Sequence, residues 1–382
     1  MLPLLLALLQ QTADPPQDWI RIGGRLQADL ARLSGEGFEQ IGALLGEDFD
    51  STTRPRRLRL RVDFLFTEEW LGRVEYDFAS GDAQPRAVTA TWRPSKGGED
   101  ESRAEYEFGF HKMPSGFERL LSSNDFDLAE EAPVEQSLTV GRQVGASARR
   151  WRPEWSAQAG VYRVYDNRTE DITQAWGMVA RAVWRPFWNQ EARELLHLGL
   201  TAGWENPDGM DSFAADVESD LIPNFLVGSV PAERTTRLAA EAAWIRGSFH
   251  GHADLLTART DDPDFGNAFL NGWTAAAGWY LTGESRAYRP DLATFDRTHP
   301  RAEFGPGTDG AGLGAWEVAA RVSSLDFGEA ALPGLPERLD TWSAGLVWHW
   351  SSHLRWLLTY TRADLGEFAP MHLTTLRFAV DF

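Results

Sequence analysis

The stretch Arg57–Phe66, RLRLRVDFLF, alternates charged and apolar residues with a period of two. Its even-numbered positions are all apolar, and its odd-numbered positions begin with three arginines and an aspartate. A β-strand points successive side chains to opposite faces, so this strand has one apolar face and one charged face. In a soluble sandwich a second sheet would cover the apolar face, and the opposite face would not carry so many arginines. The pattern therefore favours a strand between lipid and water.

The same alternation recurs along the whole chain. Ile20–Ala31 and the last residues, 375–382, show it as clearly as the first stretch. Most of the segments have the roughly 9–11 residues that a tilted strand needs to cross a bilayer. The predicted strands are 20–31, 57–66, 69–78, 86–92, 104–111, 139–148, 154–163, 174–185, 193–204, 236–246, 247–257, 272–281, 314–324, 341–350, 353–361 and 372–382. An even number of strands, about 16, predicts a closed barrel.

The connections and the aromatic residues fit a barrel in a membrane. Tight turns are expected at 66–69, 246–248 and 350–353, whereas long polar segments are expected at 32–56, 112–138, 205–235, 258–271, 282–313 and 325–340. Tryptophans lie near strand ends on the apolar face, as girdles at the two interfaces require, and the chain ends in Phe382. We therefore predict an all-β fold, a transmembrane antiparallel β-barrel with short periplasmic turns and long extracellular loops. Residues 14–382 form its single domain.

The composition restricts the possible functions. The 382 residues include 37 basic and 56 acidic ones, giving a formal net charge of -19, with 17 tryptophans and no cysteine. An acidic chain is a poor partner for nucleic acid, since phosphate backbones demand a basic surface. The absence of cysteine excludes disulfides and thiolate metal sites.

The N-terminus carries a short apolar run, Leu2–Leu9. It is too short to span a bilayer and has the length of the apolar region of a signal peptide. We expect residues 1–13 to be a signal peptide; the alternative is a buried N-terminal strand or helix. No other stretch approaches 18 apolar residues, so no transmembrane helix is predicted.

Several stretches in serial order resemble the phosphate-selective porin O and P family. They are IGGRLQAD at Ile22–Asp29, RRLRL at Arg56–Leu60, EYDFA at Glu75–Ala79, the segment Gly109–Gly145 and LTGESRAY at Leu281–Tyr288. The resemblance extends from Ile22 to Phe382. It implies a bacterial outer-membrane porin that lets small anions diffuse passively, with phosphate and polyphosphate as the candidate solutes. It also implies a homotrimer, and the outward alanines at 240, 242, 275 and 277 permit close approach between barrels.

The resemblance also implies site residues. It places Arg25, Arg56, Arg57, Lys112 and Arg142 at positions that match the family. It further implies that residues 114–132 fold into the lumen and narrow it, whereas an ordinary extracellular loop is the alternative.

Arginines of the first two strands are candidates for the anion path on chemical grounds. Arg21, Arg25, Arg57, Arg59 and Arg61 fall on the polar face of neighbouring strands, where they can form a ladder. Guanidinium groups donate bidentate hydrogen bonds to phosphate oxygens. The alternative is that these arginines pair with lumen acids and only stiffen the wall; the acids in question are Asp29, Asp63, Glu75 and Asp77. Both roles can hold together.

Metal and catalytic chemistry have weaker support. His250, His252 and Asp254 share one strand face and could ligate a metal, but polar lumen lining is the favoured interpretation. Asp261, Asp262 and Asp264 lack the spacing of a calcium loop, and no hydrolase or nucleotide-binding motif is present. We expect no enzyme, cofactor or metal. The competing functions are a plugged barrel with a structural or adhesive role and, less favoured, a barrel hydrolase.

Overall fold

The computed structural model describes residues 19–46, 48–49, 51–94, 102–166, 171–222, 224, 226–307, 310–332 and 334–382. The expected signal peptide, residues 1–13, lies outside the described residues. Among the helices of the described ranges, none has both the length and the apolar character needed to cross a membrane.

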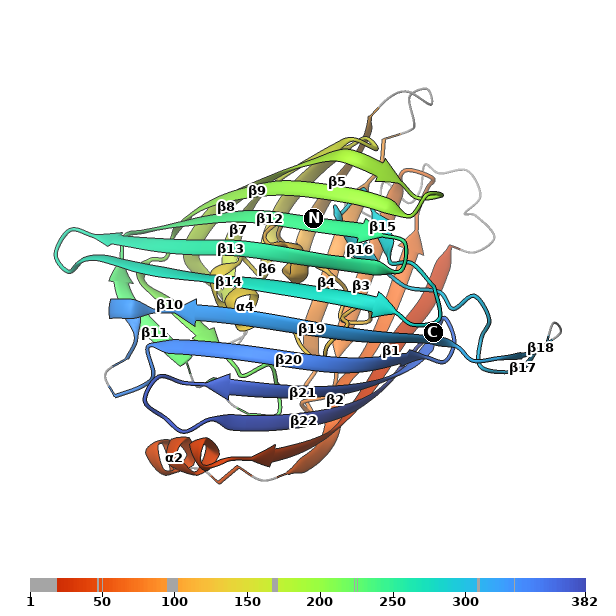
Figure 1. Cartoon of the computed structure of the whole chain (residues 1–382). Helices are drawn as coiled ribbons and strands as arrows, with labels where there is room; N and C mark the ends of the chain where they lie inside the picture. The colour runs from red at the N-terminus through yellow and green to blue at the C-terminus, as the bar shows by residue number, and fades with distance from the viewer. Residues whose placement is uncertain are drawn as a thin grey trace.

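The described residues form a closed antiparallel barrel of sixteen strands (Figure 1). The strands are β1 (Ile20–Ser34), β2 (Thr52–Leu65), β3 (Trp70–Asp77), β4 (Gln84–Trp92), β5 (Arg103–Lys112), β6 (Arg142–Trp151), β7 (Trp155–Asp166), β8 (Asp171–Asn189), β9 (Glu194–Asn206), β12 (Arg234–Arg246), β13 (Phe249–Asp262), β14 (Gly266–Tyr280), β19 (Ala315–Asp326), β20 (Arg338–His349), β21 (Leu354–Asp364) and β22 (Met371–Asp381). Each strand pairs with its neighbour in this order, and β1 pairs with β22, which closes the ring. The fold class predicted from the period-two pattern is confirmed, and every predicted strand overlaps one of these.

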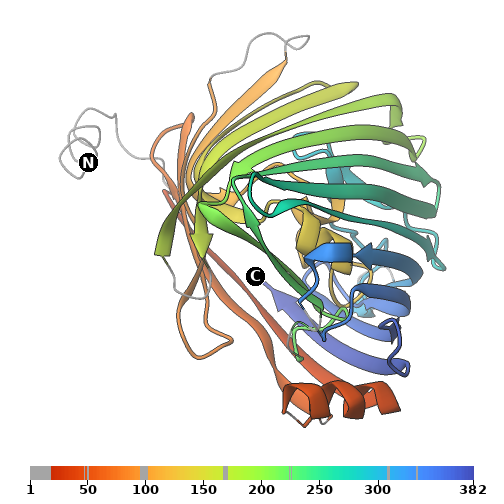
Figure 2. The same ribbon diagram turned by 90° about the vertical axis from the view of Figure 1, so that its left-hand side faces the viewer.

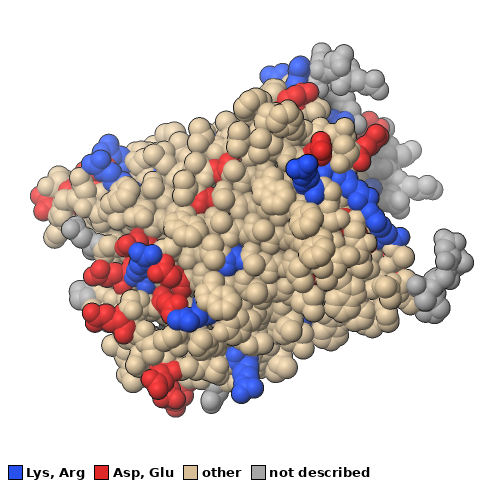
Figure 3. All heavy atoms as spheres, viewed as in Figure 1, with Lys and Arg blue, Asp and Glu red and all other residues tan. Residues whose placement is uncertain are grey.

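Alternation of side chains separates the lipid-facing surface from the lumen. On β9 and β13, Leu200 and Leu255 point outward and are more than 60% exposed, whereas the adjacent Thr201 and Asp254 point inward and are buried. In Figure 3 most of the charged side chains on the visible face lie toward the two ends of the strands. The apolar band between them is the surface that lipid covers.

Outward aromatic residues pack in pairs near both ends of the barrel. Trp176 and Trp204 have ring centroids 4.7 Å apart at one end. Trp316 and Trp348 stack 4.9 Å apart at the other end, where Trp348 also stacks on Trp350. Such belts mark the two membrane interfaces.

The connections differ from the predicted arrangement in two places. The connection at 281–314 is long but leaves the same end as the tight turns, because it joins the end of β14 to the start of β19. It contains two small hairpins, β15 (Ala287–Arg289) with β16 (Thr294–Asp296) and β17 (Gly305–Gly307) with β18 (Gly310–Gly312). The predicted long loop at 258–271 shortens to three residues, since β13 and β14 continue as strands after their outward residues turn polar.

The opposite end carries the other long connections. They hold α2 (Glu36–Leu45) after β1, the hairpin of β10 (Gly209–Ala215) with β11 (Leu226–Ala232), and η1 (Gly328–Ala330) before β20. Their buried residues pack with inward residues of β13 and β14, such as Leu256 and Leu270, in one apolar cluster.

Residues 113–141, between β5 and β6, run inside the ring of strands (Figure 2). This lumen segment contains α3 (Phe117–Leu120) and α4 (Pro133–Leu138); most of its residues are buried and none is exposed. It reaches the far wall, where the Ala129 amide donates a hydrogen bond to the Thr359 hydroxyl oxygen at 3.1 Å. There Arg355 also donates to the Phe126 carbonyl at 2.8 Å. The contacts with β21 show that the segment crosses the lumen.

Candidate functional site

A cavity of about 410 Å³ lies between the lumen segment and the wall formed by β1–β6. Eleven arginines and Lys112 line it, against five carboxylates. The arginines are Arg25, Arg57, Arg59, Arg61, Arg73, Arg86, Arg93, Arg119, Arg142, Arg149 and Arg289, and the carboxylates are Glu75, Glu105, Glu107, Asp125 and Glu131. The lining is therefore strongly cationic, although the chain as a whole carries a formal charge of -19.

A β-bulge turns two consecutive arginines toward the lumen. In the pairing of β1 with β2, Gln27 faces Arg57 and Ala28 faces Pro55, so Arg56 is the extra residue. Both guanidinium groups reach Glu130 of the lumen segment, Arg56 at 2.6 Å and Arg57 at 2.9 Å. The alternation alone would have put Arg56 on the lipid face, so the bulge explains how both arginines can be used inside.

Glu130 is the anchor of the lumen segment on this wall. Besides Arg56 and Arg57 it accepts from Arg377 of β22 at 2.6 Å, and its side chain is 5% exposed. Burial by itself raises the pKa of Glu130, but the three guanidinium groups outweigh burial and hold that pKa well below its ordinary value. Glu130 therefore stays ionised and fixes the segment to β2 and β22.

Most arginines of the cavity have a carboxylate partner. Arg59 lies 2.7 Å from Asp77, and Arg61 and Arg73 both contact Asp63, at 3.3 Å and 2.6 Å. At the other edge, Glu105 binds Arg93 at 2.7 Å and also Arg149. These pairs agree with the alternative role of the arginines, in which they pair with lumen acids and stiffen the barrel wall.

Three cations of the cavity are exceptions. Within the described ranges, Arg25, Lys112 and Arg142 have no carboxylate oxygen within 4.0 Å. Arg25 donates to the Ser123 hydroxyl at 2.7 Å, Lys112 to the carbonyls of Arg119 and Leu121, and Arg142 to the Arg86 carbonyl. Within those ranges, each of the three donates to uncharged oxygens and forms no direct ion pair.

The strand register places these three cations in like-charge pairs. Arg25 is opposite Arg59 in the pairing of β1 with β2 and opposite Asp381 in the pairing of β1 with β22, and Lys112 is opposite Arg142 in the pairing of β5 with β6. Like charges directly opposite each other destabilise a sheet, and a mobile anion between them removes that cost. The arrangement can therefore hold an anion transiently.

The predicted site residues divide into two groups. Arg25, Arg57, Arg59, Arg61, Lys112 and Arg142 line the cavity. Arg56 contacts Glu130 and Asp220 outside the cavity lining, and Arg21 is exposed near the start of β1.

Sequence reasoning missed six arginines of the lining. Arg73, Arg86, Arg93 and Arg149 lie on or next to predicted strands, so their lumen side could have been inferred from the alternation. Arg119 and Arg289 come from the two long connections, and the strand period carries no information about those.

On the other side of the lumen, the wall arginines are enclosed. Arg181 of β8 is 1% exposed, lies 2.6 Å from Glu241 of β12, and donates to the carbonyls of Leu292 and Ala293. His197 of β9 bonds to the same Glu241 oxygen at 2.9 Å. Residues 281–300 thus fill this side from the turn end, where Phe295 meets Phe117 of the lumen segment edge to face at 5.0 Å.

The comparisons with known proteins agree with this architecture. The family described as phosphate-selective porin O and P matches residues 20–365. An uncharacterized protein of Caulobacter vibrioides is 26% identical over 278 residues, which are 69% of this chain and about half, 54%, of that protein. Porin O of Pseudomonas aeruginosa is 23% identical over 347 residues, 80% of this chain and 72% of that protein.

Solved outer-membrane proteins share the fold. Pseudomonas putida OprB superposes with a TM-score of 0.58 at 10% identity, covering 96% of this chain and 94% of that one. The trimer form of Vibrio cholerae OmpT gives a TM-score of 0.53 at 12% identity, covering 94% and 98%. Together with the family match over most of the chain, these findings show that the protein is a porin of the bacterial outer membrane and belongs to the phosphate-selective porin O and P family.

Proposed function

We propose that this porin lets small anions of the phosphate class diffuse passively through the cavity between β1–β6 and the lumen segment, which forms the constriction. The observation that carries the proposal is that three cations of the cavity, Arg25, Lys112 and Arg142, have no carboxylate partner among the residues that the structure describes. In confined water a few fixed charges dominate the local potential and attract counter-ions.

Weak and distributed binding is what conduction needs. An ion must bind well enough to enter and weakly enough to leave, with several sites in sequence. The paired arginines beside the three cations, such as Arg59 with Asp77, give a graded positive field instead of one deep trap. Arginine and lysine donors suit the several oxygens of a phosphate, so phosphate or polyphosphate is the proposed preferred solute.

Planar-bilayer recording tests the proposal. The wild type should show an anion-selective reversal potential in a salt gradient, and added phosphate should reduce its chloride current. The triple variant Arg25→Gln, Lys112→Gln, Arg142→Gln should lose most of the selectivity and the phosphate effect, because the unpaired charges are gone.

A matched control removes three charges from the outer surface. Arg234, Arg246 and Arg338 are exposed on strands β12 and β20, and their replacement by Gln should leave selectivity unchanged. Cation preference in the wild type, or equal effects of the two triple variants, would refute the proposal.

A plugged barrel is the second candidate function, favoured by the filling of the lumen from both ends. Residues 113–141 and 281–300 meet at Phe117 and Phe295. If no current flows through the reconstituted protein under any salt, the plugged structural or adhesive role replaces diffusion.

We further propose that the porin forms a homotrimer through its outer faces. A shallow apolar groove of about 880 Å³ crosses the outside of β6–β13, where outward alanines such as Ala159, Ala182, Ala202 and Ala240 leave room for a neighbour. The trimer form of Vibrio cholerae OmpT and the family membership support this assembly. Light scattering in mild detergent should give the mass of three chains, and Ala182→Trp with Ala202→Trp should give monomers; a monomeric wild type would contradict it.

A further inference from the structure

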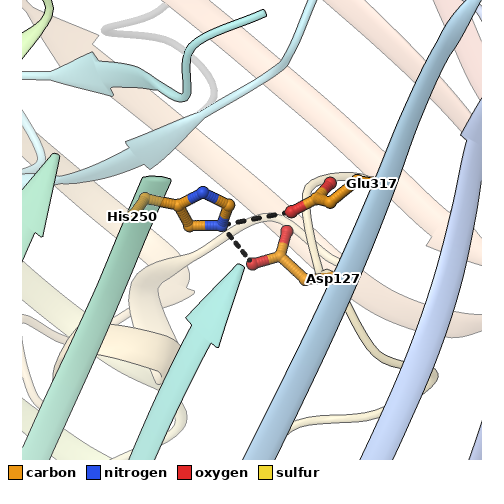
Figure 4. Close-up of side chains that lie close together, drawn as sticks. All are labelled: Asp127, His250 and Glu317. Atoms are coloured by element: carbon orange, nitrogen blue, oxygen red, sulfur yellow. Dashed lines mark hydrogen bonds and ion pairs between the residues drawn. The ribbon is translucent and has the colours of Figure 1, made fainter. Parts of the chain in front are cut away.

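Inside the barrel, three potential metal ligands converge from three different parts of the chain (Figure 4). Asp127 lies in the lumen segment, His250 on β13 and Glu317 on β19. Their ligand atoms lie within 4.8 Å of one another. The sequence spacing gave no indication of this set, because the residues are far apart in the chain.

The imidazole of His250 lies between two carboxylates. Its Nε2 atom is 3.1 Å from Asp127 Oδ2 and 3.1 Å from Glu317 Oε1. One nitrogen carries at most one proton, and the hydrogen bond goes to Asp127. In the described part of the chain Glu317 Oε1 has no hydrogen-bond partner, although the Glu317 side chain is fully buried. An unsatisfied buried carboxylate oxygen is costly, so the site calls for a second positive group.

The distances suit a small divalent cation. Nitrogen and oxygen ligands bind zinc at about 2.0–2.2 Å in a tetrahedron, which puts neighbouring ligand atoms about 3.3 Å apart. The two 3.1 Å separations at His250 need little adjustment to reach that value. A metal ion would replace the single Nε2 proton and satisfy both carboxylates at once.

The surroundings leave room for an ion and a route to it. A cavity of about 20 Å³ borders Asp127 and His250 but not Glu317, and it is large enough for one water molecule beside the three ligands. Gly278 of β14 faces the imidazole, and a Cβ atom there would collide with the His250 ring and lie 2.9 Å from Glu317. Asp127 keeps 17% of its side chain exposed, so an ion can enter from the lumen.

Neighbouring residues hold the other carboxylate oxygens away from the site. Arg286 Nη1 binds Asp127 Oδ1 at 2.6 Å, and His349 Nε2 lies 3.3 Å from Glu317 Oε2. Such outer contacts orient metal ligands. They leave Asp127 Oδ2 and Glu317 Oε1 directed at His250 Nε2.

We propose that Asp127, His250 and Glu317 form a binding site for a divalent cation of the zinc class, and that the bound ion fastens the lumen segment to β13 and β19. The competing interpretation is an imidazolium that bridges the two carboxylates with no metal. The two differ in whether the chain takes up zinc with a defined stoichiometry.

Titration of zinc chloride into the chelator-treated, purified full chain tests the site. Calorimetry or a competing zinc indicator should detect one zinc ion per chain, and zinc should raise the midpoint of thermal unfolding. His250→Gln and Glu317→Gln should each abolish this uptake. Gly278→Ala keeps all three ligands but displaces the imidazole, and should weaken zinc binding at least tenfold.

Two histidine variants outside the set act as controls. His111→Gln removes a buried imidazole on β5, and His353→Gln removes an exposed one; both should bind zinc like the wild type. The proposal would be overturned if the wild type took up no zinc, or if the His250→Gln and Glu317→Gln variants took up as much zinc as the wild type. Either result would leave the bridging imidazolium. Should one ligand variant fail to fold, the wild-type stoichiometry and the other variants decide the question.

Discussion

The two sides of the lumen use the same residue type in opposite ways. On the side of β1–β6, Arg25 and Arg142 face the cavity of about 410 Å³ and, within the described ranges, donate to uncharged oxygens without forming an ion pair. On the side of β8–β12, Arg181 is enclosed by Glu241 and by two carbonyls of the connection after β14. The difference shows that an inward arginine is not functional by itself. What decides its role is whether another segment supplies the compensating charge.

The largest effect is expected at Glu130, which anchors the lumen segment to β2 and β22. Glu130→Gln leaves the guanidinium groups of Arg56, Arg57 and Arg377 buried without their shared anion. Removing one partner of a buried ion pair costs about 3–5 kcal/mol. That range applies here because Arg57 loses its carboxylate partner, whereas Arg56 keeps Asp220 and Arg377 keeps Asp29. Chemical unfolding in detergent should show this loss, and single-channel recording should show a larger conductance as the lumen segment loosens.

The control for that variant is Asp220→Asn. Asp220 also contacts Arg56, at 3.0 Å, but is half exposed, so its loss should cost less than about 1 kcal/mol. Equal destabilisation by the two variants would mean that Glu130 is not the anchor.

A smaller loss is expected on the enclosed side. Arg181→Met leaves Glu241 with His197 as its remaining partner, so we expect the free energy of unfolding to fall by about 3 kcal/mol. The reversal potential should not change, because Arg181 does not line the cavity between β1–β6 and the lumen segment. A shift in ion selectivity as large as that of the Arg25, Lys112 and Arg142 triple variant would abolish the distinction between the two sides.

The smallest effect concerns pH. Burial raises the pKa of Glu118 in α3 to about 7 from an ordinary 4.5, although Arg321 acts in the opposite direction. The folded state then holds a proton that the unfolded chain releases, so this contribution is complete below about pH 4.5 and is lost as the pH rises through 7. At 1.36 kcal/mol per unit it amounts to about 3 kcal/mol at most. Unfolding free energies measured from pH 4.5 to 8 should fall less steeply in Glu118→Gln than in the wild type; parallel curves would exclude the assignment.

Much of the fold could be read from the period-two pattern. A strand with Leu58, Leu60 and Val62 on one face needs an apolar surrounding on that side only, and sixteen such strands close a barrel. The predicted strand at 247–257 ended too early and the one at 272–281 began too late, because Arg259 and Asp261 point outward at the interface, where the apolar pattern stops but the strands continue. The bulge at Arg56 could not be predicted either, because it is a shift in the register between β2 and its partner strand β1.

The candidate site could be predicted only in part. Arg25, Arg57 and Lys112 were recognised by alternation and by resemblance, and they line the cavity. Arg119 and Arg289 were not, because they reach the cavity from long connections whose course depends on packing inside the barrel. Asp127 and Glu317 are likewise brought to His250 only by the closure of the wall around the lumen segment.

The sequence by itself determined the strands, their two faces and the closed barrel, because local alternation between apolar and polar side chains decides which face meets lipid. Only the tertiary structure decided which inward arginines are paired. Glu130 and Glu118 come from one connection that crosses the lumen, and the arginines that they meet on β2 and β19 depend on where that connection packs. Charge pairing acts over a few ångströms between residues far apart in the chain, so no local pattern encodes it.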